Sequence, residues 1–247
     1  MCEKHSFVMD REGRCYNASG VTESHALICR IWGIDQDEVN AYEWQPPEGW
    51  PNADWTDGFK KDQINFEEKA SHVAALERYI LATFPTRDAC EHYRNPELHG
   101  RRFADQGHKI VIACQSGRFT VTEGVCWAYD QATVEACGQA TVEAYDQVTV
   151  RACDNAMVRA CDQAMVEACG QATVRACDQA TVEACDHVTV EACDQVTVRA
   201  YGQATVIKPL WYHNNAKVKL GGLAVLIDRT VYGKVSIERA ARGEVQP

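Results

Sequence analysis

An eight-residue repeat in the middle of this 247-residue chain constrains its fold more than any other feature. Ten octads follow one another over residues 128–207 without insertion or deletion, and their one-letter consensus is A-[CY]-[DG]-Q-[AV]-T-V-[ER]. Small apolar and polar residues alternate within each octad, which is the two-residue period of a β-strand. A helix, with about 3.6 residues per turn, cannot keep an eight-residue register on one face. A short strand and a tight corner, repeated strictly, predict a β-solenoid.

The corner of each octad is predicted at its third residue, which is Asp or Gly in all ten octads. Both residue types tolerate the left-handed backbone conformation that a tight corner needs. All three glycines of this position fall in one set of alternate octads, which favours a coil of 16 residues. The other set holds only aspartate, at Asp130, Asp146, Asp162, Asp178 and Asp194.

The charged last position of the octad supports the same coil length. At a spacing of 16 residues, five of seven stacked pairs have opposite charge, whereas at 24 residues like charges stack, as with Arg151 and Arg175. Stacked strands lie about 4.8 Å apart, so like charges there are destabilising. The inward Ala and Val residues suit two closely packed sheets. We therefore predict a mainly β fold, a two-sided β-solenoid with 16-residue coils of two octads each, preceded by a small α/β N-terminal domain.

Three segments are predicted: an α/β head domain over 1–108, the octapeptide-repeat solenoid over 109–207, and degenerate strands with a C-terminal cap over 208–247. In the head, strands are predicted over 6–9 and 39–45. A helix is predicted from an N-cap at Thr22 to Trp32, with Gly33 ending it. Further helices are predicted over 66–84 and 87–93, and a linker or docking segment over 100–107.

The repeat resembles the bacterial octapeptide-repeat β-solenoids, of which the ice-nucleation proteins are the best-known branch. The resemblance covers the 80 residues of the ten octads, and the periods of eight and 16 residues carry it. Ice-nucleation repeats show Thr-x-Thr rows, whereas here Glu or Arg generally stands two positions after Thr. A charged column does not give the flat, weakly hydrated face of an ice template, so ice binding is not expected.

Cysteine is frequent, with 13 residues, and the chain starts without an apolar run. The absence of an export signal predicts a cytoplasmic protein with reduced thiols. Seven cysteines share the second octad position, in the ladders Cys137, Cys153, Cys169 and Cys185, and Cys161, Cys177 and Cys193. Such ladders allow soft-metal binding or disulfides between coils. Because Tyr129, Tyr145 and Tyr201 share the position, we predict structural stacking instead, with no metal and no cofactor.

The column of five aspartates allows a second kind of cation site, because carboxylates are ligands for hard divalent cations. Glycine fills the equivalent position in three of the other octads. We therefore predict that these aspartates were selected for backbone conformation and form a structural ladder.

A tryptophan-rich segment, residues 44–55, is the most unusual local feature of the head. Trp44, Trp50 and Trp55 are predicted to form a partner-binding surface; the alternative is a loop folded onto the core of its own domain. The head has no H-E-x-x-H, C-x-x-C, P-loop or G-x-G-x-x-G motif, so no catalytic residue is predicted. An enzyme would need a Cys–His or His–carboxylate site assembled in space.

The net charge is −10, with −7 in residues 1–108, −7 in 109–207 and +4 in 208–247. An acidic body argues against direct nucleic-acid binding, and apolar runs of at most eight residues exclude a membrane-spanning helix. We predict a non-enzymatic structural or interaction protein, in which a rigid solenoid rod carries a head that binds another protein. Association of copies through the solenoid ends is compatible with this fold. The alternatives are an acidic DNA-imitating inhibitor of a DNA-binding enzyme, similar in charge to pentapeptide-repeat solenoids, and an enzyme with its site in the head.

Overall fold

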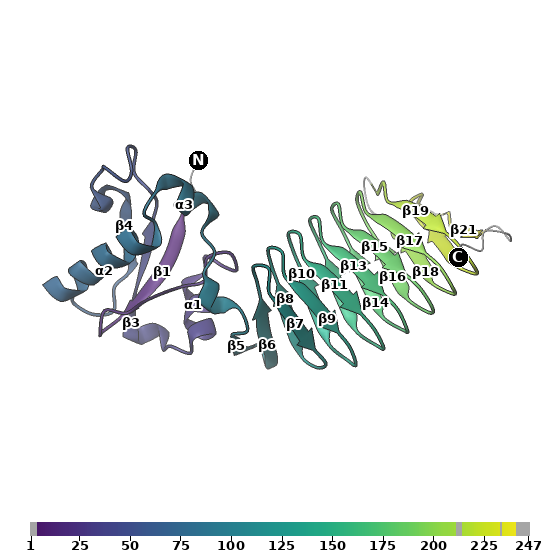
Figure 1. The fold of residues 1–247 in the computed structure, drawn as a ribbon, viewed down its shortest axis with the longest axis horizontal. Coiled ribbons are helices and arrows are strands. Elements are labelled where there is room, and N and C mark those ends of the chain that lie inside the picture. Colours follow the sequence, from purple (N-terminus) through teal and green to yellow (C-terminus); the bar gives the residue numbers. More distant parts are fainter. Residues whose placement is uncertain (1–3, 211–213, 233, 241–247) are drawn as a thin grey trace. The chain divides into compact units, whose positions relative to one another are not determined.

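The computed structural model describes residues 4–210, 214–232 and 234–240. The chain forms two compact units, one of residues up to Leu98 together with Arg102–Gly107, the other of His99–Arg101 and the residues from His108 onward. Figure 1 labels most helices and strands of the two units. Within the described ranges, no helix is long and apolar enough to cross a membrane.

The first unit is built on an antiparallel sheet in the order β2–β1–β3–β4. Its strands are β1 (His5–Asp10), β2 (Cys15–Asn17), β3 (Val39–Trp44) and β4 (Phe59–Gln63). The helices are α1 (His25–Trp32), α2 (Ala70–Thr83) and α3 (Arg87–His92); the unit also contains 3-10 turns at Gln36–Glu38, Trp55–Gly58 and Pro96–Leu98, and strand β5 (Arg102–Asp105). Every residue of β1 is buried, because α1 packs against this strand and side chains of α2 join the core that β1 and β3 form.

Several local predictions for the head need correction. Ser24, not Thr22, is the N-cap of α1, and its hydroxyl accepts a hydrogen bond from the Leu27 N–H. Gly33 ends this helix as predicted, with a left-handed φ of 69°. Helix α2 starts later than predicted, at Ala70. Residues 100–107, predicted as a linker or docking segment, contain strand β5, whose residues alternate between exposed and half-buried.

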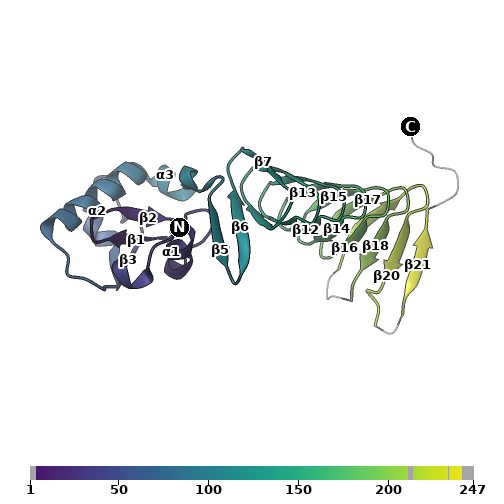
Figure 2. The same ribbon diagram turned by 90° about the horizontal axis from the view of Figure 1, so that it is seen from below.

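The second unit is a β-solenoid of about seven turns with coils of about 16 residues (Figure 2). One sheet contains, in order, β6 (His108–Ala113), β8 (Val125–Ala128), β10 (Thr141–Ala144), β12 (Met157–Ala160), β14 (Thr173–Ala176), β16 (Thr189–Ala192), β18 (Thr205–Lys208) and β20 (Val225–Asp228). The other contains β7 (Arg118–Val121), β9 (Thr133–Ala136), β11 (Thr149–Ala152), β13 (Met165–Ala168), β15 (Thr181–Ala184), β17 (Thr197–Ala200) and β19 (Lys217–Leu220).

Neighbouring strands of each sheet are parallel and in register. Val142 pairs with Val158, and Val150 pairs with Val166, so stacked residues are 16 positions apart. The predicted two-sided coil is therefore confirmed. It places the octads alternately on the two sheets.

The core between the two sheets is a continuous column of alanine and valine. In one octad, Ala132, Val134 and Ala136 have no exposed surface, and the same three positions are buried in every later octad up to Val206. Small side chains let the sheets approach closely, which explains why two octads suffice for a coil.

The last coil departs from the repeat but continues the stack. Thr197 pairs with Lys217 and Thr205 with Val225, so the spacing there is 20 residues instead of 16. Strand β21 (Ser236–Arg239) then runs antiparallel to β20. The degenerate strands expected after the octads thus extend both sheets, as far as Asp228.

Candidate functional site

The corner aspartates combine a backbone requirement with a hydrogen bond. Asp146 has a φ of 56°, and the corner glycine Gly170 has a φ of 70°. The Asp146 carboxylate accepts a hydrogen bond of 3.1 Å from the N–H of Asp130, the corner residue one coil earlier. Equivalent bonds of 3.1–3.5 Å repeat along both corner columns, at Asp130, Asp154, Asp162, Asp178, Asp186 and Asp194. Glycine adopts the left-handed conformation but offers no carboxylate to accept the hydrogen bond. This accounts for the column in which Gly138, Gly170 and Gly202 alternate with Asp154 and Asp186.

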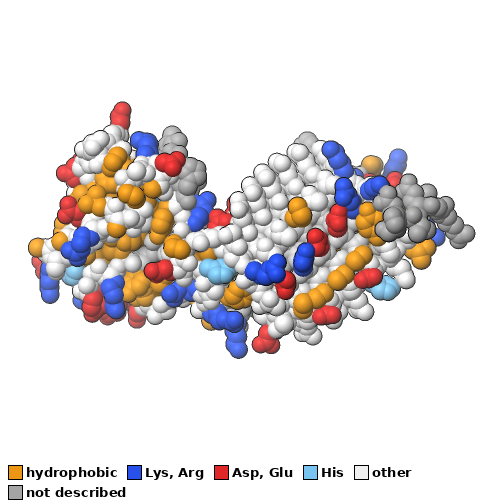
Figure 3. All heavy atoms as spheres, viewed as in Figure 1, with side chains coloured by type: hydrophobic (Ala, Val, Ile, Leu, Met, Phe, Trp, Pro, Cys, Tyr) orange, Lys and Arg blue, Asp and Glu red, His pale blue; other side chains and the backbone are white. Residues whose placement is uncertain are grey.

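Charged side chains on the outer surface pair with those of neighbouring coils. Arg151 contacts Glu167 at 3.2 Å, and Arg199 contacts Glu183 at 2.9 Å. Figure 3 shows Lys or Arg and Asp or Glu side chains interspersed on this face. Because the partners are half-exposed, each pair contributes at most about 1 kcal/mol. Each pair neutralises one glutamate of the acidic surface locally.

The second octad position forms ladders of sulfur and of aromatic rings. The thiols of Cys153, Cys169 and Cys185 lie 3.4–3.6 Å from backbone carbonyl oxygens of the preceding coil, to which they donate hydrogen bonds. In the other ladder, the rings of Tyr129 and Tyr145 stack with their centroids 5.3 Å apart and an interplanar angle of 14°. Cysteine and tyrosine therefore both fill this position with side chains that contact the neighbouring coil.

The protonated form of these thiols is favoured. A hydrogen bond with the Cys137 thiol, together with burial, raises the pKa of Cys153 to about 12. Burial, with a similar bond to Cys161, raises the pKa of Cys177 to about 12. Burial also raises the pKa of Cys185 and of Cys193. At neutral pH these cysteines are thiols rather than thiolates, which makes them weak nucleophiles.

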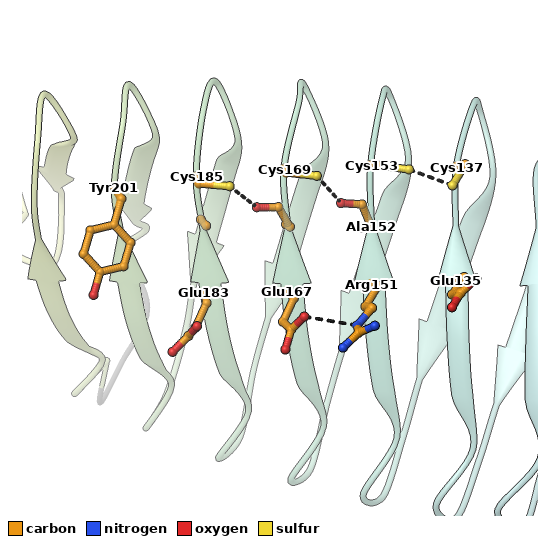
Figure 4. Close-up of a pocket in the computed structure, with 12 residues that line it drawn as sticks. Glu135, Cys137, Arg151, Ala152, Cys153, Glu167, Cys169, Glu183, Cys185 and Tyr201 are labelled. Atoms are coloured by element: carbon orange, nitrogen blue, oxygen red, sulfur yellow. Dashed lines mark hydrogen bonds and ion pairs between the residues drawn. The ribbon is translucent and has the colours of Figure 1, made fainter. Parts of the chain in front are cut away.

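A groove of about 490 Å³ runs along the outer side of one sheet, across β9, β11, β13, β15 and β17. The cysteine ladder forms one side and the charged column the other, and Tyr201 stands at one end (Figure 4). The groove is lined mainly by apolar atoms, and its residues are Glu135, Cys137, Arg151, Ala152, Cys153, Glu167, Ala168, Cys169, Glu183, Ala184, Cys185 and Tyr201.

Two groups of three possible metal-ligating residues occur on the ladders. In each, two thiols and the carboxylate of the corner aspartate next to the second cysteine lie within 4.8 Å of one another. The groups are Cys137, Cys153 and Asp154, and Cys161, Cys177 and Asp178. In the part of the chain that the structure describes, no other His, Cys, Asp and Glu side chains gather in this way. The repeat predicted the ladders, but only side-chain rotamers show which sulfurs approach each other.

The three tryptophans of the predicted partner-binding surface lie mostly inside the head. Trp44 is fully buried and Trp50 is 6% exposed, whereas Trp55 is half-buried. The Trp44 indole donates a hydrogen bond of 2.9 Å to the Trp55 carbonyl, and the Trp50 indole donates one of 2.8 Å to the Phe84 carbonyl. The indoles therefore anchor the segment to the core and leave its polar residues outside.

Two histidines of the head, His72 and His25, contact backbone groups. Nε2 of His72 lies 2.8 Å from the Arg11 carbonyl, and its Nδ1 accepts from the Lys69 N–H at the start of α2. Nε2 of His25 lies 3.0 Å from the Tyr42 carbonyl, and its Nδ1 lies 3.1 Å from an Asp62 carboxylate oxygen. His25 and Asp62 form a His–carboxylate pair, but both ring nitrogens of His25 already have partners.

No protein-family model, curated protein or solved structure matches this chain.

Proposed function

We propose that this chain is a non-enzymatic interaction protein, in which the solenoid is a rigid scaffold and the α/β head recognises another protein. The main support is the way the solenoid uses its outward polar groups. The corner carboxylates bind backbone N–H groups, and charged side chains such as Arg151 and Glu167 pair between coils. A surface whose polar groups are engaged with its own coils suits length and stiffness, and its repetition offers little single-site specificity.

The head offers the more specific surface, at the acidic loop of residues 45–58. Glu48, Asp54 and Asp57 are exposed there, while buried Trp44 and Trp50 fix the loop to the core. A loop that is ordered before binding pays less entropy on association. Three exposed carboxylates favour a partner with a basic surface.

The solenoid is the competing location, and it supports the DNA-imitating alternative through its net charge of −7 in residues 109–207. Arg151, Arg175 and Arg199 interrupt that charge and pair with glutamates, which is why we propose the head as the site of recognition. Thr alternates with Glu or Arg on most strands, so we do not propose ice binding. Association of two copies through β7 and β19, the end strands of one sheet, is compatible with this function.

Two full-length variants separate head from solenoid. One carries Glu48→Gln, Asp54→Asn and Asp57→Asn; the other carries Asp146→Asn, Asp162→Asn and Asp178→Asn. Each replaces three carboxylates with amides of the same shape, and asparagine at position 54 keeps the hydrogen bond to the Thr56 N–H.

Capture of the protein's partner from a lysate, quantified for both variants and the parent chain, tests the proposal. We expect the head variant to lose the partner and the solenoid variant to keep it. The reverse pattern would place recognition on the solenoid and support the DNA-imitating alternative.

A further inference from the structure

Two pairs of thiols on successive coils lie close to bonding distance. The sulfurs of Cys137 and Cys153 are 2.6 Å apart, and those of Cys161 and Cys177 are 2.9 Å apart. A disulfide bond measures about 2.05 Å, so each pair needs a displacement of less than about 1 Å.

The solenoid backbone also fits such a bond. Neighbouring strands lie about 4.8 Å apart, and disulfides join Cα atoms separated by about 4.4–6.8 Å. The Cys153 N–H donates to the Ala136 carbonyl at 2.9 Å, and the Cys177 N–H donates to the Ala160 carbonyl at 2.9 Å. These backbone bonds remain when the thiol hydrogens are lost, so oxidation leaves neither carbonyl without a donor.

Other cysteines of the ladders provide an internal comparison. Cys169 and Cys185 stand one coil apart in the same ladder as Cys137 and Cys153. Their thiols donate to the carbonyl oxygens of Ala152 and Ala168 at 3.6 and 3.4 Å, as those of Cys153 and Cys177 do to the coils before them. Among the described residues, however, the sulfurs of Cys169 and Cys185 are not in contact with each other. Repetition of the sequence alone therefore does not determine which thiols meet.

We propose that Cys137 with Cys153, and Cys161 with Cys177, are oxidation sites at which a hydroperoxide links successive coils by a disulfide. One sulfur attacks the peroxide and cleaves its O–O bond, giving a sulfenic acid and water when hydrogen peroxide is the oxidant. The partner sulfur then attacks the sulfenic sulfur, the S–O bond breaks, and the hydroxide leaves with the second thiol proton as water. The two thiols lose two electrons and two protons in all, and the peroxide is reduced.

The local chemistry makes this reaction slow near neutral pH. The raised pKa of Cys153 and of Cys177, each about 12, keeps the attacking thiolate scarce. The rate of linking should therefore rise as the pH is raised. The sites are stabilising crosslinks rather than rapid peroxide sensors.

A thiophilic cation is the competing occupant, because Asp154 and Asp178 lie within 4.8 Å of the paired sulfurs. Two Zn–S bonds of about 2.3 Å at a tetrahedral angle hold their sulfurs about 3.8 Å apart. The observed separations are nearer to a disulfide than to that arrangement, which is why we favour oxidation.

Peptide mapping of the full chain tests the proposal directly. The protein is treated with hydrogen peroxide, its remaining thiols are alkylated in denaturant, and it is digested with trypsin without reduction. Cleavage after Arg151, Arg159 and Arg175 places the two cysteines of each pair on different peptides. We expect residues 119–151 linked to 152–159, and residues 160–175 linked to 176–199, each with the loss of two hydrogens.

Serine variants of single cysteines supply the controls. Cys153→Ser should abolish the first link and leave the second, and Cys177→Ser should do the opposite. Cys169→Ser and Cys185→Ser should leave both links, because those thiols are not paired. The readout is confined to the solenoid, so it is independent of whether the head binds a partner.

Three results would overturn the proposal. One is the absence of linked peptides while the thiols oxidise to sulfinic acids. Another is loss of the second link in Cys185→Ser, which would assign it to Cys169 and Cys185. The last is stoichiometric zinc that survives dialysis of the untreated chain and is lost in Cys153→Ser.

Discussion

Replacing the corner residue Asp146 separates the two contributions that the structure assigns to this column. Asp146 has a left-handed φ of 56°, and its carboxylate accepts a 3.1 Å hydrogen bond from the Asp130 N–H. Alanine loses the acceptor, worth about 1 kcal/mol, and adds about 1 kcal/mol of left-handed strain that aspartate and glycine largely avoid. Asp146→Ala should therefore cost about 2 kcal/mol, the sum of these two terms.

Two further substitutions at the same position separate the contribution of the hydrogen-bond acceptor from that of the backbone conformation. Asp146→Gly keeps the conformation and loses the acceptor, so its cost should be about 1 kcal/mol. Asp146→Asn keeps the backbone conformation and the hydrogen-bond acceptor, and it removes one charge from a column of stacked carboxylates. The free energy of unfolding of this variant should therefore stay within about 0.5 kcal/mol of that of the parent chain. Conversely, Gly170→Asp should be tolerated, because it offers the Asp154 N–H an acceptor, whereas Gly170→Ala should destabilise.

Urea unfolding followed by far-ultraviolet circular dichroism measures these differences, because most strands belong to the solenoid. Tryptophan fluorescence is the internal control, since four of the six tryptophans lie in residues 1–108. Equal stability of the alanine and asparagine variants would refute the reasoning. A destabilised asparagine variant, with a parent chain stabilised by added Ca²⁺, would show that the column binds cations instead.

Two other predictions test the coil length and the head. Deletion of half a coil, residues 152–159, stacks like charges: Arg151 lies on Arg175, and Glu143 on Glu167. Deletion of a whole coil, residues 152–167, stacks opposite charges: Arg151 lies on Glu183, and Glu143 on Arg175. Raised salt should therefore stabilise the half-coil deletion but not the full-coil deletion, and equal salt responses in urea unfolding would contradict the 16-residue coil. In the head, burial would raise the pKa of Asp10, but hydrogen bonds from Arg14 and Tyr16 outweigh it and hold the pKa below its usual value. Asp10 thus stabilises the head above a pH of about 4 and loses this effect as the pH falls further; Asp10→Asn should flatten that acid dependence in fluorescence-monitored unfolding.

The solenoid was predictable because the same pattern of a short strand and a corner occurs ten times in the sequence. A single alternating segment such as Thr133–Ala136 does not by itself establish a strand, because it is only four residues long. The charged position and the corner position of the ten octads, however, both favour a coil of 16 residues. The head offers no such repetition. Strand β4 is mostly polar and exposed, so its pairing with β3 decides its conformation more than its own sequence does.

The candidate sites were predictable only in part, for a related reason. Sequence spacing placed Cys137 and Cys153 on adjacent coils, but rotamers decide that their sulfurs meet. The tryptophan segment drew attention as a surface, yet burial of the large indoles of Trp44 and Trp50 contributes more to a core than to an exposed loop. Its short acidic residues, which carry no distinctive pattern, remain outside.

The in-register stacking of coils has a consequence for how such a gene can change. Each coil contacts only its two neighbours, and every coil presents nearly the same surface to the next. Duplication or loss of the codons for one whole coil therefore preserves both flanking junctions, whereas a change by half a coil moves every later octad to the opposite sheet. Recombination between repeats can thus lengthen or shorten this solenoid in steps of about 4.8 Å, the spacing of stacked strands, while the head and the last coil keep their own structures.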